Sequence, residues 1–173
     1  MTLPRAGAPA AGLRALLVAI AALGSTCRAG ADGKVRNWFD DPFFQISADV
    51  ADCPVPAGPF VDESERRVQA HHRAERGTTC WLARECEKPN AYAYDRDIAS
   101  AFRNAARERN PFAATTLWVT VQGRVVYIEG CATADAQIAP IEDYARAIPY
   151  VQQAIAIVRV GAAPPPYKLR ERR

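Results

Sequence analysis

The sequence has no apolar run long enough to cross a bilayer. Its N-terminal run, Ala15–Leu23, falls well short of the roughly 20 residues that a membrane-spanning helix needs. Two arginines precede this run and the small residues Ala29-Gly30-Ala31 follow it, which is the pattern of a secretory signal peptide. We therefore expect residues 1–31 to be removed by cleavage after Ala31 and the protein to be exported. An uncleaved anchor is the alternative.

Cys27 allows an alternative interpretation of the N-terminus. It follows Leu23-Gly24-Ser25-Thr26, so a lipoprotein anchored through Cys27 is an alternative localisation. Thr26 is large for the position before a lipidated cysteine, and glycine stands where an aliphatic residue is expected. Cleavage after Ala31 would instead discard Cys27.

Residues 32–173 carry no net charge. The full chain has 22 basic and 19 acidic side chains, and Arg5, Arg14 and Arg28 lie in the predicted signal peptide, which leaves 19 of each sign. A neutral chain has no bulk attraction to a polyanion, so we expect no nucleic-acid partner. Only the end of the chain is locally basic. It is either a solvated terminus or a contact for lipid headgroups through Lys168, Arg170, Arg172 and Arg173.

Short cysteine motifs are also missing. The chain has no CxxC redox pair, no CxxCH haem site and no closely spaced cysteine pair of the kind found in structural zinc sites. Zinc held with His71 and His72 is therefore the weaker alternative, and we expect no metal and no cofactor. An even number of cysteines in an exported protein favours two disulfides, in one of three connectivities, among Cys53, Cys80, Cys86 and Cys131.

Three regions follow the signal peptide, and they differ in regularity. The first is rich in turn-forming residues and predicts an irregular, cysteine-containing arm. One helix is expected in it near residues 62–76, because acids stand at its start, arginines at its end and Gly77 just beyond. The regions are the arm over 32–93, a regular domain over 94–161 and a proline-rich, basic C-terminal tail over 162–173.

The regular domain predicts an α+β fold. Apolar residues on one helical stripe, Ile98 and Phe102 among them, follow the helix-capping Asp95. The hairpin Leu117–Cys131 comes next, then a shorter helix and a last strand over Val151–Val160. The order is αββαβ, so we expect two helices on one face of a three-stranded mixed sheet.

The hairpin has two unlike faces. Alternation along its first arm predicts one apolar face for the core and a second face that carries aromatic residues and Cys131. With the turn at Gln122-Gly123, the opposed pairs would be Leu117/Ile128, Val119/Val126 and Trp118/Tyr127.

Two interpretations of the second face are open. We favour closure by the arm through a disulfide from Cys131 to one of the three upstream cysteines, with Trp81, Leu82 or the Trp38–Phe44 aromatics covering the face. The alternative is an open aromatic binding surface made by Trp118, Tyr127 and Tyr150.

Four short motifs in the regular domain match a known family. They are Asp97-Ile98 in the first helix, Val119–Val125 in the hairpin, Gly130 after the second strand and Ile148–Val151 before the last strand. With these motifs, residues 95–161 resemble a single BON domain, a module of bacterial periplasmic and outer-membrane stress proteins. Tyr150 and Ala154 depart from the family pattern, which usually has glycine and valine at those positions.

The resemblance implies a non-enzymatic binding module and, with the predicted cleaved signal peptide, a location in the periplasm. Its partner would be anionic phospholipid, in envelope maintenance or the stress response, or alternatively an envelope protein in an assembly role. We expect no small-molecule substrate. The residues also argue against an enzyme, because the regular domain has no histidine, and Ser64 and Ser100 lack the setting of a nucleophile.

Overall fold

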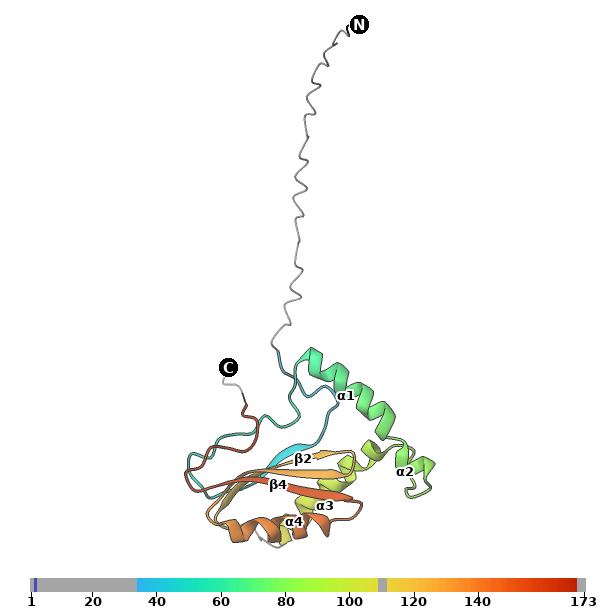
Figure 1. The fold of residues 1–173 in the computed structure, drawn as a ribbon. Coiled ribbons are helices and arrows are strands. Elements are labelled where there is room, and N and C mark those ends of the chain that lie inside the picture. The colour runs from blue at the N-terminus through green and yellow to red at the C-terminus, as the bar shows by residue number, and fades with distance from the viewer. Residues whose placement is uncertain (1, 3–33, 109–111, 171–173) are drawn as a thin grey trace. The chain divides into compact units, whose positions relative to one another are not determined.

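The computed structural model describes residues 2, 34–108 and 112–170. The predicted signal peptide with Cys27, and the tail residues Arg172 and Arg173, lie outside the described residues. The described chain has an α+β fold built on a four-stranded mixed sheet (Figure 1). In sheet order the strands are β1 (Phe43–Ala48), β2 (Thr115–Gln122), β3 (Val125–Ala132) and β4 (Gln153–Val160).

The α+β class is confirmed, but the prediction of three strands is wrong. The extra strand, β1, comes from the arm that the sequence predicts to be irregular, and it pairs antiparallel with β2. β2 and β3 are also antiparallel, whereas β3 and β4 are parallel. The pairing of β1 shifts register between Gln45 and Ser47. Phe44 and Ile46 pack against the core and Gln45 is exposed, so the strand does alternate, but it is short and follows a turn-forming segment with Pro42.

The turn between β2 and β3 lies one residue later than the sequence predicts. Gly123 and Arg124 occupy its two central positions with φ of 62° and 69°, the positive values that a type I′ turn requires. The predicted opposed pairs are therefore wrong by two residues. A shift by an even number leaves every side chain on its expected face. The observed pairs include Leu117/Gly130, Trp118/Glu129, Val119/Ile128 and Thr120/Tyr127.

Asp95 explains how the turn accommodates an arginine in the left-handed region. One of its carboxylate oxygens accepts a hydrogen bond from the Gly123 N–H at 2.7 Å, and the other accepts from the Arg124 N–H at 2.9 Å. Both turn amides are thus satisfied by a residue that is far away in the sequence. The position of the turn is stabilised from outside the hairpin.

One face of the sheet holds the apolar core. Helices α3 (Asp95–Glu108) and α4 (Ile138–Arg146) lie on this face in Figure 1, as the sequence predicts. The Phe102 ring is fully buried and lies 5.7–6.1 Å from the rings of three other aromatic residues, Phe44, Phe112 and Tyr144. Other core residues include Ile98, Leu117, Val119, Val121, Val126, Ile128, Ile141 and Ala145.

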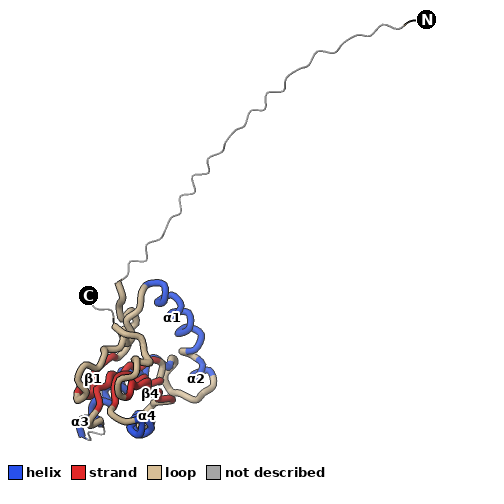
Figure 2. The backbone as a smooth tube through the Cα atoms, turned by 60° about the vertical axis from the view of Figure 1, so that its left-hand side comes forward, coloured by secondary structure: helices blue, strands red, loops and turns tan. Residues whose placement is uncertain are grey.

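Apart from β1, much of the arm lies on the side of the sheet opposite α3 and α4. Helix α1 (Glu63–Arg76) is the helix expected near 62–76, and Asp62 caps it by accepting a hydrogen bond from the Glu65 N–H at 2.9 Å (Figures 1 and 2). None of the residues of α1 is buried. Within the described residues, no helix combines the length and the apolar character that crossing a membrane requires. The remaining elements are α2 (Thr79–Leu82) and the 3-10 turns η1 (Ala91–Tyr94) and η2 (Asp135–Gln137).

Candidate functional site

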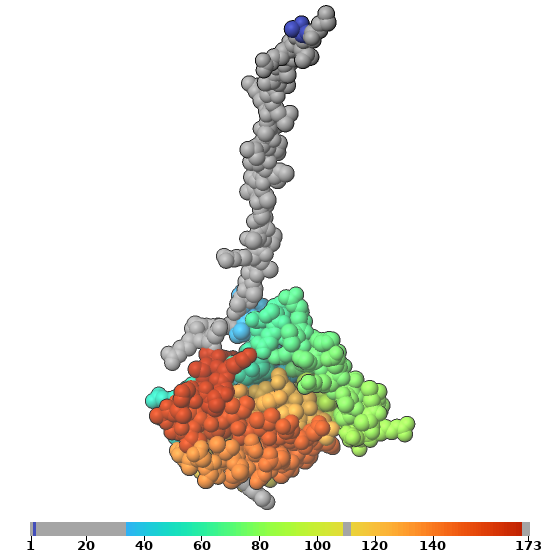
Figure 3. All heavy atoms as spheres, viewed as in Figure 1, coloured from blue at the N-terminus to red at the C-terminus, as the bar shows by residue number. Residues whose placement is uncertain are grey.

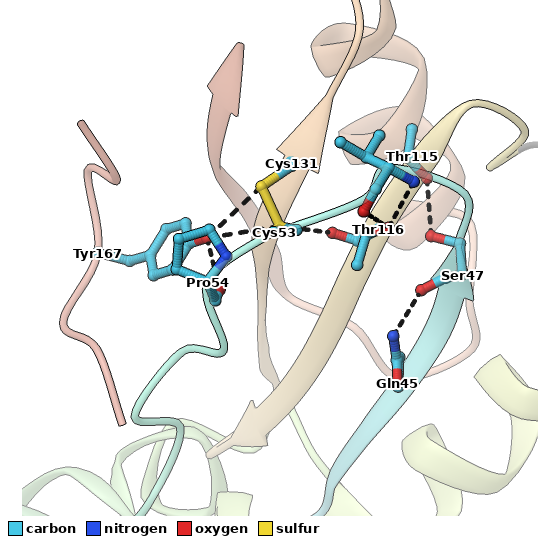
Figure 4. Close-up of a disulfide and its surroundings, with 9 residues drawn as sticks. Gln45, Ser47, Cys53, Pro54, Thr115, Thr116, Cys131 and Tyr167 are labelled. Atoms are coloured by element: carbon cyan, nitrogen blue, oxygen red, sulfur yellow. Dashed lines mark hydrogen bonds between the residues drawn. A yellow bond between two sulfur atoms is a disulfide. The ribbon is translucent and has the colours of Figure 1, made fainter. Parts of the chain in front are cut away.

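Two disulfides tie down the arm, as the cysteine count predicts. Cys53 is bonded to Cys131, with the Cα atoms 5.9 Å apart (Figure 4). Cys80 is bonded to Cys86, with the Cα atoms 5.5 Å apart. Of the three upstream cysteines, Cys53 is thus the one that reaches the second face of the hairpin. Cys131 itself is 1% exposed.

Tyr167 from the C-terminal tail covers this disulfide. Its hydroxyl donates a hydrogen bond to the Pro54 carbonyl at 2.9 Å and lies 3.7 and 3.8 Å from the two bonded sulfur atoms (Figure 4). The ring is largely buried, and burial raises the pKa of the Tyr167 phenol. Sequence reasoning missed this residue. The only signal is an aromatic side chain directly after the three consecutive prolines of a polar tail.

The three aromatic residues proposed for an open surface are placed very differently. Trp118 is 9% exposed and belongs to the interior, Tyr127 is half-buried, and Tyr150 is 52% exposed. The Tyr150 ring packs against Tyr94 at 5.2 Å. The proposed covers differ too, because Trp81 and Leu82 point into solvent rather than onto the face. The arm closes the second face through other contacts, one of which involves Phe39 from the predicted Trp38–Phe44 segment.

Arg73 on α1 provides this contact. Its guanidinium lies between the rings of Phe39 and Tyr92, at 3.9 and 4.3 Å from their centroids. It also donates to the Asp41 carboxylate at 2.5 Å, and that carboxylate accepts a second hydrogen bond from the Gln122 amide at 2.7 Å. Asp41 is buried, so its charge is compensated where water is scarce. This cluster fastens α1 to the hairpin.

Two acidic side chains, Asp95 and Glu129, are shielded from water. Asp95 is 3% exposed, and burial raises its pKa to about 6 despite the two amide hydrogen bonds that favour the carboxylate. Burial also raises the pKa of Glu129. His71 and His72 are exposed on α1, where His71 lies 3.0 Å from Glu75. In the described part of the chain, no three His, Cys, Asp or Glu side chains are grouped as a metal ion would need.

The C-terminal tail is docked onto the arm as far as Arg170. Leu169 forms a bridge opposite Pro56, in which the Ala57 N–H donates to the Lys168 carbonyl at 2.8 Å and the Arg170 N–H donates to the Val55 carbonyl at 3.0 Å. Lys168, Leu169 and Arg170 are nevertheless exposed, Leu169 to 50%. The tail is therefore a fixed part of the surface.

The beginning of the described chain lies beside this tail. Arg36 bridges to Val61, and the Arg170 guanidinium lies 4.4 Å from the centre of the Phe60 ring. A hollow of about 190 Å³ separates the two segments and is lined by both of them, with Val35 and Leu169 among its walls. We define the terminal patch as the exposed side chains on and beside the segments that line this hollow. Lys168, Leu169 and Arg170 line it, Lys34 and Arg36 flank the lining residue Val35, and the Val55 carbonyl accepts the hydrogen bond from Arg170.

The exposed side chains of the terminal patch carry four positive charges and no negative charge, and the half-buried acids Asp62 and Glu65 line the hollow between them. Lys168 lies 3.5 Å from Glu65, but Lys34, Arg36 and Arg170 form no ion pair with any described residue. Val55 and Leu169 add exposed apolar surface beside these cations. The patch can therefore hold a ligand that is both anionic and partly apolar.

The chain was compared with known proteins on three levels. Nothing matched it among family models, curated proteins or solved structures.

Proposed function

We propose that this protein is a non-enzymatic, BON-type envelope module that binds the surface of anionic phospholipid through the terminal patch. The observation that carries the proposal is the docking of the C-terminal tail at Val55 and Pro56. It brings two cations of the tail next to two cations of the N-terminal segment, around the exposed side chains of Val55 and Leu169.

The chemistry of the patch suits a phospholipid headgroup region. A lysine or arginine held near an anionic membrane contributes about 1 kcal/mol of attraction, and several such residues act together. Leu169 and Val55 can leave water as the surface is approached, which adds an apolar contribution. The attraction would weaken with added salt, because exposed charges are screened.

The rest of the chain supports an envelope setting. The described elements α3, β2, β3, α4 and β4 run in the αββαβ order expected for the BON-like region. Two disulfides suit an oxidising compartment such as the periplasm. Lys34 stands three residues after Ala31 and seven after Cys27. Cleavage after Ala31, or a lipid on Cys27, would thus place the patch next to the mature N-terminus.

Vesicle co-sedimentation of the mature protein tests the proposal. We expect binding to vesicles containing phosphatidylglycerol, weak binding to pure phosphatidylcholine, and a loss of about tenfold or more in the K168E/R170E variant, since two attractions become repulsions. The matched control is R103E/R107E, which changes the same charge on α3 across the sheet and should keep most of the binding.

Equal binding of the wild type to both kinds of vesicle, or unchanged binding of K168E/R170E, would contradict the proposal. Salt-insensitive capture of an envelope protein, without vesicle binding, would favour an assembly module instead.

A further inference from the structure

A short loop closed by the second disulfide carries the most exposed large apolar side chain of the described chain. We define the finger as residues 79–86, which comprise α2 and the return turn held by Cys80–Cys86. Leu82 in this loop is 76% exposed, and its neighbour Trp81 is 46% exposed. Figure 3 shows this part of the chain, in light green, as a protrusion from the body of the molecule.

The finger is held so that these two side chains stay in water. The Leu82 N–H donates to the Thr78 carbonyl and the Ala83 N–H to the Thr79 carbonyl, both at 3.0 Å. The return turn adds hydrogen bonds from Arg84 to Trp81 and from Glu85 to Cys80, at 3.0 and 2.8 Å. With the disulfide, they order the finger before any partner arrives, which lowers the entropy cost of binding.

The tip of the finger has the composition of a membrane-interface anchor. Residues 81–84 are tryptophan, leucine, alanine and arginine, all exposed and none acidic. Arg84 turns the chain with a φ of 59°, and it forms no ion pair with any described residue. Glu85 lines a separate hollow of about 290 Å³ with Tyr127 and Gln152, on the side toward the hairpin. Tryptophan is enriched where bilayer headgroups meet acyl chains.

Helix α1 connects the finger with the terminal patch. It begins beside the tail, where Glu65 lies 3.5 Å from Lys168, and it ends three residues before α2. Figures 1 and 2 both show α1 extending from the region of the C-terminal segment to α2. The exposed side of α1 includes Arg67 and Val68, with Val68 57% exposed. Arg67 and Val68 thus add one cationic and one apolar side chain between the patch and the finger, on a helix whose exposed side also carries Glu75.

We propose that the finger inserts Trp81 and Leu82 into the interfacial region of the anionic bilayer that the terminal patch binds. The inference rests on the proposed function, because the patch supplies the electrostatic attraction and the finger adds apolar burial. Arg84 remains at headgroup level, where it meets lipid phosphate.

Tryptophan fluorescence with brominated phospholipids tests the insertion directly. The mature protein would be mixed with vesicles of phosphatidylglycerol and phosphatidylethanolamine in which part of the lipid carries bromine near the headgroup. We expect quenching in the wild type and its loss in the W81F variant, because Trp118 is buried and Trp38 is half-buried with its indole N–H bonded to Val61. Equal quenching in W81F would overturn the inference.

A partition measurement gives a second readout. W81A/L82A should bind the same vesicles about tenfold or more weakly, because two apolar side chains no longer leave water. The control is Y150A, which removes a similarly exposed aromatic side chain outside the finger and should bind like the wild type. Unchanged partitioning of W81A/L82A would also count against insertion.

The two proposals fail in different ways. If the wild type binds anionic vesicles and K168E/R170E does not, yet Trp81 is not quenched, insertion of the finger is wrong and the terminal patch stands. If the wild type does not bind anionic vesicles at all, the proposed function itself is wrong.

Discussion

The two faces of the sheet are held by different forces. On one face α3 and α4 bury a continuous apolar core, with Phe102 and Ile98 fully buried. On the other face α1 buries no residue and is fastened by the Arg73 cluster beside the hairpin turn, while Cys53–Cys131 and Tyr167 close the other end of the hairpin. Because α1 is held by polar contacts, its docking gains little from the hydrophobic effect. Covalent and charged links hold this side of the sheet instead. Different substitutions should therefore lower the stability contributed by each face.

The largest effect should come from the apolar face. Phe102→Ala removes a fully buried ring that contacts three other aromatic rings, and its loss should cost close to 5 kcal/mol, the upper end for such truncations. The free energy of unfolding from urea titration measures it. Val68→Ala on the exposed side of α1 is the control and should change stability little. A small loss for Phe102→Ala would mean that this face is not the main source of stability.

The next largest loss of stability should come from the polar face, on removal of the Cys53–Cys131 disulfide. Cys53→Ala/Cys131→Ala opens a loop with a sequence separation of 78, for which chain entropy predicts a loss of about 4.5 kcal/mol. Cys80→Ala/Cys86→Ala opens a separation of only 6, and about 2 kcal/mol is expected. The same urea titration compares the two variants, and a reversal of their order would show that strain or residual structure outweighs loop length.

The smallest effect should appear where the two faces meet, at Asp95. Its pKa is about 6 in the folded chain and 3.8 as the reference for the unfolded chain, so the folded state binds more protons between these values. The free energy of unfolding should therefore rise as the pH falls from 7 toward 4, by about 2 kcal/mol from this group.

Asp95→Asn isolates this contribution, because Glu129 has a raised pKa as well and acts in the same direction. The wild type should gain more stability than the variant over the same pH range, measured by thermal or urea unfolding. Equal pH slopes would show that Asp95 does not titrate in this range.

Local pattern was a good guide wherever neighbouring residues decide the structure. Helix α1 has its cap at Asp62 and its end at Gly77 because those contacts join residues within one turn. The faces of the hairpin followed from alternation, which survives a register error of two residues. Strand β1 was missed because its short alternating run lies between turn-forming and proline-rich segments. The terminal patch was predicted only in part, because the sequence shows the basic tail but not its docking site at Val55.

The sequence by itself determined the α+β class, the apolar stripe of α3, the helix near 62–76 and the presence of two disulfides. Only the tertiary structure decided that Cys53 is the partner of Cys131, that Asp95 sets the turn, that Tyr167 covers the disulfide and that Trp81 and Leu82 stay exposed. The physical reason is the sequence separation between the residues that determine each feature. The first group depends on periodicity and composition along the chain, whereas each member of the second depends on which distant segments exclude water from one another.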